Sequence, residues 1–512
     1  MLSMVRRINT QMTGGGKRQR LPYQNRVAAR SATYYLKTIS IHCSESFSSE
    51  AMQDQPLPIW PPHLAPHGGP RFLQIADALQ SAVAQGVLKP GDRLPPQRRL
   101  AEQLQVDLTT VTRAYDEARR RQLLEGRGAR GTYVAAPKVE LTAILDLSMN
   151  TPPAPRGVDF GDLLQQGLSQ VLMRADNALL MTYHLGGGSQ AGRQAGAQWL
   201  APMFGALDAS EVVVCPGAQA AIAALMLALT APGDVILAEP LSYPGLRTAA
   251  LQLGRRIVAV PTDAQGMLPD ALEQACHLHK PSLLYLNPTL QNPTAITMSA
   301  QRRAAIAHVA QRHRLRMVED DPYWLLAAAA PPPLATLAPD LVCYVSTLSK
   351  CLTPGLRVAY VRIRDAQVRE RFLVALRSFA LMVAPLTAAL ATQWIVDGSA
   401  NRLMEGVRKE ARDRHWMARE VLAGRYSGAD DGLHVWLELP SYWHSLQLAR
   451  AADAAGIAVT PAEAFAVERS STVNAIRISL GGVQDRERLQ AGLHRLSQLL
   501  AQEPQALHGA IV

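Results

Sequence analysis

The chain has 512 residues and a formal net charge of +10, with apolar residues at 48% and charged residues at 18%. This composition excludes a wholly disordered, collagen-like or disulfide-stapled chain, and the length predicts about three folding units of roughly 150 residues each. The five cysteines stand far apart without metal-binding spacing, so we expect free thiols in a reducing cytoplasm and no metal site. No apolar run reaches about 18 residues, and no membrane partner is expected.

The positive charge lies at the front of the chain. Residues 1–51 carry 8 basic and 2 acidic side chains, and residues 66–140 carry 12 and 8. Residues 1–65 show no sustained periodicity and are predicted to form a disordered basic extension, with a transit-peptide-like leader as the alternative. A basic front end joined to an almost neutral body indicates a polyanionic partner for the front end.

Residues 66–136 are predicted to form three helices followed by a hairpin. Apolar residues recur at helical spacing from Leu73 to Val83, and a turn at Lys89–Asp92 leads into a second, short amphipathic helix. Asp107 is placed to cap a third helix that begins at the next residue. Two short strands then flank a turn rich in glycine and arginine, residues 126–131. This order is typical of a winged helix-turn-helix domain.

The third helix and the turn carry side chains that suit DNA. Short hydroxyl groups and an arginine at a helix N-terminus let the backbone approach phosphates while side chains reach base edges. The patterns LP..R.LA, T.TV.RAY and G.GT.V resemble the winged helix-turn-helix of GntR-family regulators. A three-helix packing unit with a solvated arginine-rich face is the alternative, but it leaves the recognition motif and the glycine wing unexplained. The expected DNA-binding residues are Arg98, Arg99, Thr109, Thr110, Thr112, Arg113, Arg127 and Arg130.

Residues 146–512, which follow a linker predicted at 137–145, indicate an α/β fold. Short apolar runs alternate with amphipathic helices, a pattern typical of a mainly parallel central sheet. Val212–Val214, Val235–Leu237 and Met317–Val318 are among the expected strands. Several strands end in polar, glycine or proline residues, and ligands bind at that edge of such sheets. A ligand site is therefore expected at the carboxyl ends of the strands.

A lysine, a carboxylate and a phenol form the chemical centre of the expected site. Lys350 is an amine able to form a Schiff base, the internal aldimine, with pyridoxal phosphate. Asp320 would pair with the pyridine nitrogen and keep the ring an electron acceptor. Tyr323, three residues later, would hydrogen-bond the 3′ oxygen of the ring. These three residues are the expected catalytic groups.

Other polar groups are expected to hold the ring and its phosphate. Asn292 would bind the 3′ oxygen, and Tyr243 would stack on the ring face. Arg357, seven residues after the lysine, offers a bidentate fork to the phosphate. Each signal is weak alone, but their order along the chain predicts a pyridoxal phosphate site. The rest of the phosphate cradle is expected to consist of Gly217, Ala218, Gln219, Thr347 and Ser349.

The arrangement resembles class I/II aminotransferases of fold type I over roughly residues 146–500. The resemblance implies a smaller C-terminal α+β subdomain after the main sheet. It assigns Arg477 to the α-carboxylate of an amino ligand, against the alternative of an exposed surface arginine. It also assigns Tyr183 to the cofactor phosphate of the neighbouring subunit, against the alternative of a core tyrosine. Ala218 and Ala295 depart from the hydroxyl residue and the glycine that the family often has there.

A GntR-like DNA-binding domain joined to an aminotransferase-like domain resembles the MocR-type subfamily of regulators. The resemblance implies a homodimeric transcriptional regulator that binds double-stranded DNA and senses pyridoxal phosphate, or a small amino compound, through the aldimine of Lys350. One alternative is a catalytically active aminotransferase that transaminates 2-oxo acids and carries an accessory DNA-binding domain. Another alternative is a DNA-binding protein with a cofactor-free body. Because the motifs of the DNA-binding domain are complete and basic, the sequence favours the regulator.

Overall fold

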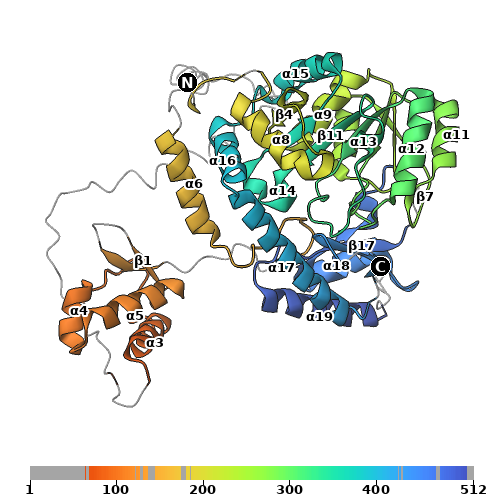
Figure 1. Cartoon of the computed structure of the whole chain (residues 1–512). Helices are drawn as coiled ribbons and strands as arrows, with labels where there is room; N and C mark the ends of the chain where they lie inside the picture. Colours follow the sequence, from red (N-terminus) through yellow and green to blue (C-terminus); the bar gives the residue numbers. More distant parts are fainter. Residues whose placement is uncertain are drawn as a thin grey trace, which may run out of the picture. The chain divides into compact units, whose positions relative to one another are not determined.

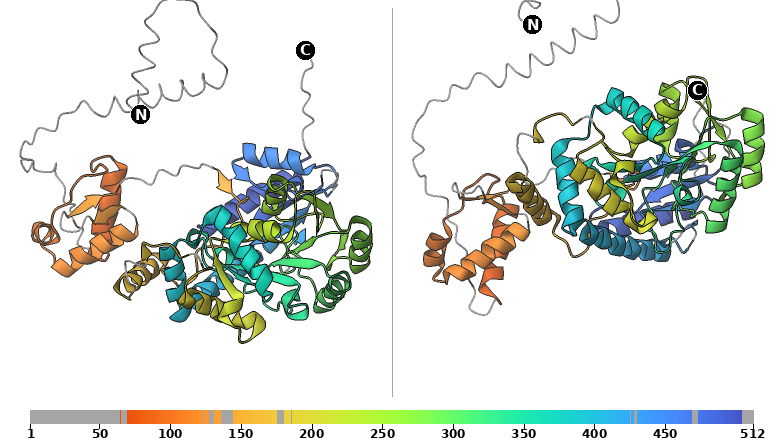
Figure 2. Two further views of the ribbon diagram at one scale, coloured as in Figure 1. Left: turned by 90° about the horizontal axis from the view of Figure 1, so that it is seen from above. Right: turned by 45° about the horizontal axis from the view of Figure 1, so that its top comes forward.

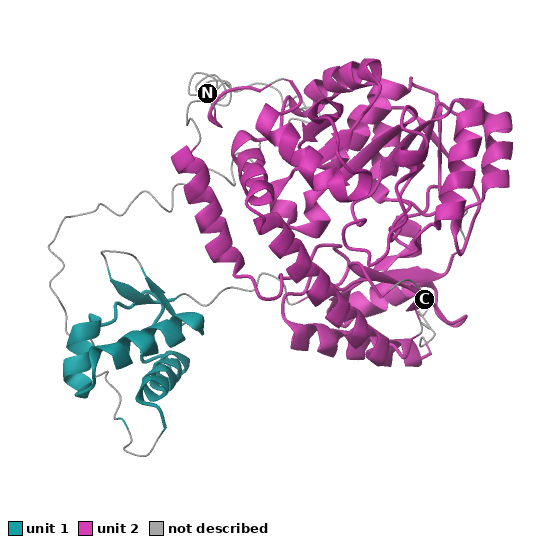
Figure 3. Cartoon of the chain, viewed as in Figure 1, with its two compact units in different colours: residues 1–139 teal, residues 140–512 magenta. Residues whose placement is uncertain are grey.

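The computed structural model describes residues 64, 69–121, 123–126, 131–135, 144–174, 180–184, 186–424, 426–427, 430–468 and 473–503. The chain divides into two compact units between Val139 and Glu140 (Figure 3). Arg127 and Arg130 lie outside the described residues, as does all of the extension predicted for residues 1–65 except Leu64.

The described residues of unit 1 form three helices and a hairpin. The helices pack around buried side chains such as Leu79, Leu100 and Tyr115, whose hydroxyl donates to the carbonyl of Pro95 at 2.9 Å. Helix α5 begins directly after Asp107, as expected, but the Asp107 side chain accepts no hydrogen bond from the helix, so that part of the prediction is wrong. The elements are α3 (Arg71–Ala84), α4 (Gln97–Leu104), α5 (Leu108–Arg120), β1 (Leu124–Gly126) and β2 (Thr132–Val134), the two strands being antiparallel.

Unit 2 is built on a seven-stranded sheet with the order β4-β12-β11-β10-β9-β5-β6. Strand β12 runs antiparallel to both of its neighbours, and the other neighbouring pairs are parallel. The predicted mainly parallel α/β fold is therefore confirmed. The strands are β4 (Val212–Cys215), β5 (Val235–Ala238), β6 (Arg256–Ala259), β9 (Leu283–Leu286), β10 (Arg316–Asp320), β11 (Val342–Thr347) and β12 (Ala359–Arg362).

The two faces of this sheet contribute to two separate hydrophobic cores, because alternate residues of a strand point to opposite faces. In β10, Met317 belongs to one core and Val318 to the other. Figures 1 and 2 show helices enclosing the sheet. The first core contains residues of α6 (Phe160–Arg174), α8 (Gln190–Phe204), α11 (Pro269–His279), α12 (Ala300–His313), α13 (Leu334–Leu337), α14 (Leu348–Cys351), α16 (Pro385–Val396) and α17 (Ser399–Val421), and the second contains residues of α9 (Ala218–Leu229), α10 (Pro244–Gln252) and α15 (Ala366–Ala380).

A smaller α+β subdomain follows α17. Its antiparallel sheet has the order β13-β14-β17-β16, and a third core joins this sheet to its helices. No described helix combines the length and the apolar character needed to cross a membrane. The remaining elements are β3 (Leu145–Asp146), which pairs with β15 (Ile457–Ala458), the hairpin β7 (Thr262–Asp263) and β8 (Gly266–Met267), β13 (Tyr426–Ser427), β14 (His434–Glu438), β16 (Thr460–Pro461), β17 (Ala475–Ser479), α18 (Ser445–Ala454) and α19 (Arg486–Ala501).

Candidate functional site

A buried carboxylate lies at the carboxyl end of β10. Asp320 Oδ2 accepts a hydrogen bond from the hydroxyl of Tyr285 at 2.6 Å, while Oδ1 is buried and has no hydrogen-bond partner among the described residues. Burial raises the pKa of Asp320 to about 6, although the Tyr285 hydrogen bond and the charge of Lys350 oppose this rise. An unpartnered carboxylate oxygen in such a position can accept from a buried N–H group, such as a protonated ring nitrogen.

The two carboxylates beside Asp320 have a different environment. Glu319 accepts from the backbone amides of Leu334 and Ala335, each at 2.9 Å. Asp321 accepts from the Thr289 hydroxyl at 2.9 Å. Both lie on the same side as the fully buried Arg303, whose guanidinium donates to that hydroxyl and stands 3.7 Å from Glu319. These two acids therefore hold the sheet edge together, and Asp320 alone of the three accepts from Tyr285.

Lys350 lies on the short helix α14, directly after β11. Its amine donates to the backbone carbonyl of Asn150. Burial, followed by the positive charge of Arg477, lowers the pKa of Lys350 to about 8. The proximity of Asp320 opposes this effect. A lysine with such a pKa is partly neutral near physiological pH, and the neutral amine is the form that attacks a carbonyl.

Tyr323 is buried, and its hydroxyl has a hydrogen-bond partner that sequence reasoning missed. The Asn150 side-chain amide donates to the Tyr323 hydroxyl at 2.9 Å and also lies 3.1 Å from Nδ1 of His434. His434 is itself buried and follows Asn150 by 284 residues, so no local spacing announces the contact. Asn287 was missed as well: its amide donates to the Asp320 carbonyl at 2.6 Å.

Arg477, on β17, is 6% exposed, so the alternative of an exposed surface arginine is wrong. One guanidinium nitrogen donates to Asn292 Oδ1 at 2.7 Å, and another donates to the Ser148 carbonyl. The guanidinium also lies over the Phe465 ring, 4.9 Å from its centroid. Nε is buried without a hydrogen-bond partner among the described residues. A guanidinium in this state can bind a carboxylate.

The start of α9 lies next to Arg357. Gly217 precedes the helix with a φ of +91°, and a Cβ there would stand 2.8 Å from the guanidinium of Arg357. Glycine therefore lets the arginine approach the helix N-terminus, where backbone amides and the helix dipole favour a phosphate. Gln219 donates to the Gly245 carbonyl at 3.0 Å, and Thr347 donates to Ser349 at 3.0 Å.

Two tyrosines complete the set of expected site residues in unit 2. Tyr243 precedes α10 and is half-buried, and its pKa is raised by burial and by the negative charge of Asp320. Tyr183 is 74% exposed, so the alternative of a core tyrosine is wrong.

Six of the expected DNA-binding residues of unit 1 lie on α4 and α5. Arg98, Arg99 and Thr109 are exposed, and Thr110 is half-buried. Two other expected DNA-binding residues, Thr112 and Arg113, have contacts that sequence reasoning missed. The Thr112 hydroxyl donates to Gln97 Oε1 at 2.9 Å, and the Arg113 guanidinium lies over the Phe72 ring, 4.4 Å from its centroid.

Comparison with known proteins accounts for both units. Residues 72–134 match the gntR family of bacterial regulatory proteins, and residues 142–496 match the class I and II aminotransferases. The HTH-type transcriptional regulator YdeF of Bacillus subtilis is 31% identical over 448 residues, which cover 86% of this chain and 96% of YdeF. The chain belongs to the MocR-type subfamily of GntR regulators.

Other relatives of this MocR-type chain extend the comparison. The pyridoxine biosynthesis regulator PdxR of Corynebacterium glutamicum is 28% identical over 362 residues, covering 68% of this chain and 78% of PdxR. The structure of LysN, an α-aminoadipate aminotransferase of Thermus thermophilus complexed with N-(5'-phosphopyridoxyl)-L-leucine, is 26% identical with a TM-score of 0.64. The matched region covers 70% of this chain and 93% of the LysN chain.

Pyridoxal phosphate is the cofactor of this family, and the residues of unit 2 fit it. The unpartnered Asp320 oxygen suits the ring nitrogen, the buried Lys350 amine suits the aldehyde, and the helix start at Gly217 suits the phosphate. When bound, this cofactor supplies an aldehyde that combines with amines and a ring that withdraws electrons.

Proposed function

We propose that this MocR-type regulator binds double-stranded DNA through unit 1 and senses pyridoxal phosphate, or a small amino compound, at Lys350 of unit 2. The observation that carries the proposal is the half-buried Lys350, whose amine donates to the Asn150 carbonyl and whose pKa is lowered to about 8 by burial and by the charge of Arg477, with Asp320 opposing that shift. In this proposal, the Lys350 amine bonds to the aldehyde of the cofactor. The Asp320 carboxylate accepts a hydrogen bond from the ring nitrogen, and the Arg477 guanidinium binds the α-carboxylate of an amino ligand.

The remaining residues bind and orient. Tyr323 and Asn292 hydrogen-bond the 3′ oxygen of the ring, and Tyr243 stacks on the face of the ring. The phosphate is held at the start of α9 by Ala218, Gln219, Arg357, Thr347 and Ser349, with Tyr183 contributed by the second subunit of a homodimer. The high exposure of Tyr183 supports this last assignment, because a buried phenol could not reach a neighbouring chain.

DNA binding relies on cations and hydroxyl groups of α4 and α5. Base edges and nearby phosphates are contacted by Thr109, Thr110, Thr112 and Arg113. Phosphates alone are contacted by Arg98 and Arg99. A ligand changes DNA affinity only if it binds two states of the protein with different affinities. Regulation therefore requires that occupancy of the Lys350 site favours one state of the DNA-binding unit.

The test combines two measurements on the full chain. An operator is first selected from a random duplex pool. The visible absorbance of the pyridoxal phosphate-loaded protein and its operator affinity are then followed during titration with amines and amino acids. We expect one class of amine to change both signals. Rapid keto-acid production without sequence-specific DNA binding would instead identify an aminotransferase, and a colourless protein after reconstitution would refute the cofactor site.

A further inference from the structure

The segment from Leu145 to Asn150 lies near the start of the first described stretch of unit 2, and it leads from the linker into the ligand site. Its start is held by the smaller subdomain, because β3 pairs with β15 and the Leu147 amide donates to the Ala458 carbonyl at 2.9 Å. The Ser479 amide donates back to the Leu147 carbonyl at 2.8 Å. The segment thus has a defined position at its linker end.

Backbone oxygens of this segment hold both cations that face the ligand. The Ser148 carbonyl accepts from Arg477, and the Asn150 carbonyl accepts from Lys350. Either interaction uses a hydrogen on the cation that a ligand would also need. A carboxylate arriving at Arg477, or a bond formed at the Lys350 amine, therefore competes directly with a carbonyl of the segment.

The side chain of Asn150 fixes the other end of the segment. Its amide donates to the Tyr323 hydroxyl at 2.9 Å and approaches His434 Nδ1 at 3.1 Å. Nε2 of that histidine lies 3.1 Å from the Gln291 carbonyl, which can only accept. The ring is therefore protonated at Nε2 and accepts at Nδ1, so that the hydrogen bonds of the network are mutually consistent.

We propose that Asn150 couples the ligand site to the linker, as a positioning residue whose carbonyl loses the Lys350 hydrogen bond when the aldehyde takes up the Lys350 amine and regains it when an incoming amine frees the lysine. This inference rests on the proposed sensing function and adds the route by which the site acts on the chain. Asn150 Oδ1, buried without a partner among the described residues, leaves the side chain one acceptor with which to bind a ligand N–H in the displaced state. The partners of Asn150 then change together, which gives the segment two discrete arrangements.

The test uses Asn150→Ala in the full chain. The variant keeps the Asn150 carbonyl but loses the anchor to Tyr323 and His434, so the segment is released without a ligand. We expect the cofactor to remain covalently attached, with a shifted pH midpoint of its visible absorbance. The ratio of operator affinities with and without the amine should fall to within about twofold of one. Met149→Ala is the matched control in the same segment, because the Met149 side chain is 60% exposed and the backbone of the segment is retained.

A wild-type response to the amine in Asn150→Ala would overturn the coupling. Asn150→Asp guards against misfolding, since it keeps the shape of the side chain and removes both amide donors, and it should lose the response as well. If the wild-type protein shows no response to any amine, the proposed function fails instead, so the two failures are distinguishable.

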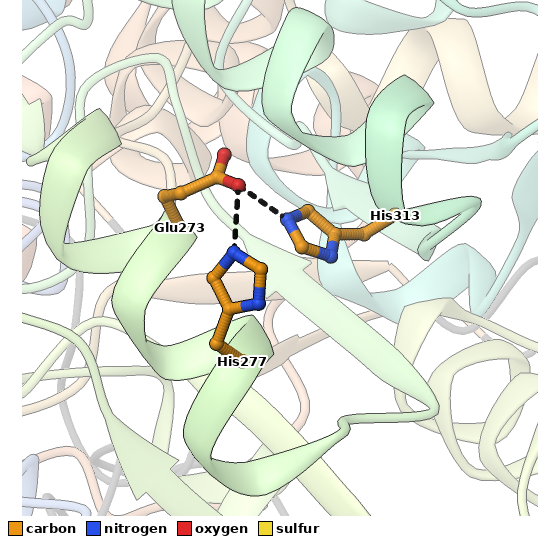
Figure 4. Close-up of side chains that lie close together, drawn as sticks. All are labelled: Glu273, His277 and His313. Carbon is orange, nitrogen blue, oxygen red and sulfur yellow. Dashed lines mark hydrogen bonds and ion pairs between the residues drawn. The ribbon is translucent and has the colours of Figure 1, made fainter.

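A second, independent observation concerns the outer helices α11 and α12. Glu273 and His277 are one turn apart on α11, and His313 ends α12 (Figure 4). Glu273 Oε1 lies 3.2 Å from His277 Nε2 and 2.6 Å from His313 Nε2. Among the described residues, this is the one group of three or more histidine, cysteine or carboxylate side chains whose donor atoms converge within 4.8 Å.

The donor set matches a zinc-class cation. Two imidazoles with one carboxylate are a common zinc ligand set, and zinc bonds of about 2.0–2.1 Å in tetrahedral geometry separate neighbouring ligand atoms by about 3.3 Å. The distance of 3.2 Å between Glu273 Oε1 and His277 Nε2 fits this separation, whereas the 2.6 Å hydrogen bond to His313 Nε2 has to open by a small side-chain movement when the ion binds. The imidazole planes meet at 83°, so the rings approach the carboxylate from different directions. Arg312 pairs with the other oxygen, Glu273 Oε2, and so orients the carboxylate as an outer partner of a ligand commonly does.

We infer that Glu273, His277 and His313 bind one zinc ion, with the fourth position left to water or an outside donor. Sequence reasoning expected no metal site because the cysteines lack metal-binding spacing. This group was not noticed, since His313 follows His277 by 36 residues and no short motif links them. The side chain of His277 is 72% exposed, so an ion can reach the site from solvent.

Calorimetric titration of the chelator-treated full chain with zinc chloride tests this inference. We expect one equivalent more in the wild type than in His277→Ala or His313→Ala. The control His279→Ala, on the same helix but outside the group, should keep the wild-type stoichiometry. Equal stoichiometry in all four proteins would overturn the site, as would the absence of zinc binding in the wild type.

Discussion

The cations assigned to DNA in unit 1 and those assigned to the ligand in unit 2 differ in how they are placed. In unit 1, Arg98, Arg99 and Arg113 are exposed. In unit 2, Lys350 and Arg477 are held by backbone carbonyls inside the domain. Exposed cations act on a polyanion at low cost in stability, whereas a buried cation is costly unless it is hydrogen-bonded. Under the proposed function, Lys350 and Arg477 contact the ligand, and the exposed arginines of unit 1 contact DNA.

The largest effect is expected from Lys350→Ala. The variant should lose covalent cofactor attachment completely, because no other residue supplies that amine, while folding and basal operator binding persist. Mass spectrometry after borohydride reduction measures the attachment, and thermal unfolding measures the fold. Lys280→Ala, at an exposed lysine, is the control. An adduct retained in Lys350→Ala would contradict the assignment.

The pH dependence of cofactor attachment sharpens the contrast between a buried and an exposed cation. Because the pKa of Lys350 is lowered to about 8, the neutral amine increases as pH rises and saturates above that value. We expect the attachment rate to increase about 50-fold from pH 6 to pH 8 and then to gain only about twofold more before it levels off, whereas an ordinary lysine would continue to gain up to about pH 10.4. Stopped-flow absorbance provides the rates. A rate still rising tenfold per unit above pH 9 would refute burial of the amine.

Arg477→Ala should reduce the affinity for amino acids by roughly 10- to 100-fold, since hydrogen bonds to charged groups contribute about 1.5–3 kcal/mol. Amines without a carboxylate should bind as they do to the wild type. The comparison of an amino acid with its decarboxylated amine, by absorbance titration, isolates the carboxylate contact. If both ligands weaken equally, Arg477 acts on the structure of the site and not on the ligand.

Arg113→Ala should weaken binding to the selected operator by about tenfold or more, because a side chain that contacts a base contributes about 1–3 kcal/mol. Cofactor spectra should be unchanged. Arg119→Ala on the same helix is the control, since Arg119 is engaged by Asp116 near the end of α5. Fluorescence anisotropy with operator and scrambled duplexes measures specificity. Unchanged operator affinity would place base recognition elsewhere.

The smallest effect is expected for Arg98→Ala. The loss of one phosphate contact should reduce the slope of log affinity against log salt by about one, similarly for operator and non-specific DNA. Anisotropy titrations across a salt series give this slope. A change confined to the operator would indicate that Arg98 reads sequence.

The sequence predicted the elements of this fold because its signals are local. Helical periodicity placed α3, and the groups that follow the strands meet at one edge, as Asp320 and Lys350 do. The contacts of Asn150 with Tyr323 and His434 were not predictable, because they span 173 and 284 residues and involve no motif. Packing of the subdomain against the main sheet brings these side chains together.

The contact of Asn292 with Arg477 illustrates the same limit. Each residue was assigned to a ligand from its motif, but the hydrogen bond between them depends on a strand 185 residues away. The position of Arg113 over Phe72 was also missed, since the helices α3 and α5 must first pack before the pair can form.

Three acids in a row at the end of β10 have a consequence for how this protein tolerates change. Glu319 and Asp321 point toward Arg303, whereas Asp320 points the other way toward Tyr285, because side chains alternate along a strand. A slip of one residue against β9 and β11 would therefore exchange the acid at Tyr285 for one of its neighbours without altering the composition of the edge. Insertions and deletions in this strand should be far more harmful than conservative replacements of the same residues.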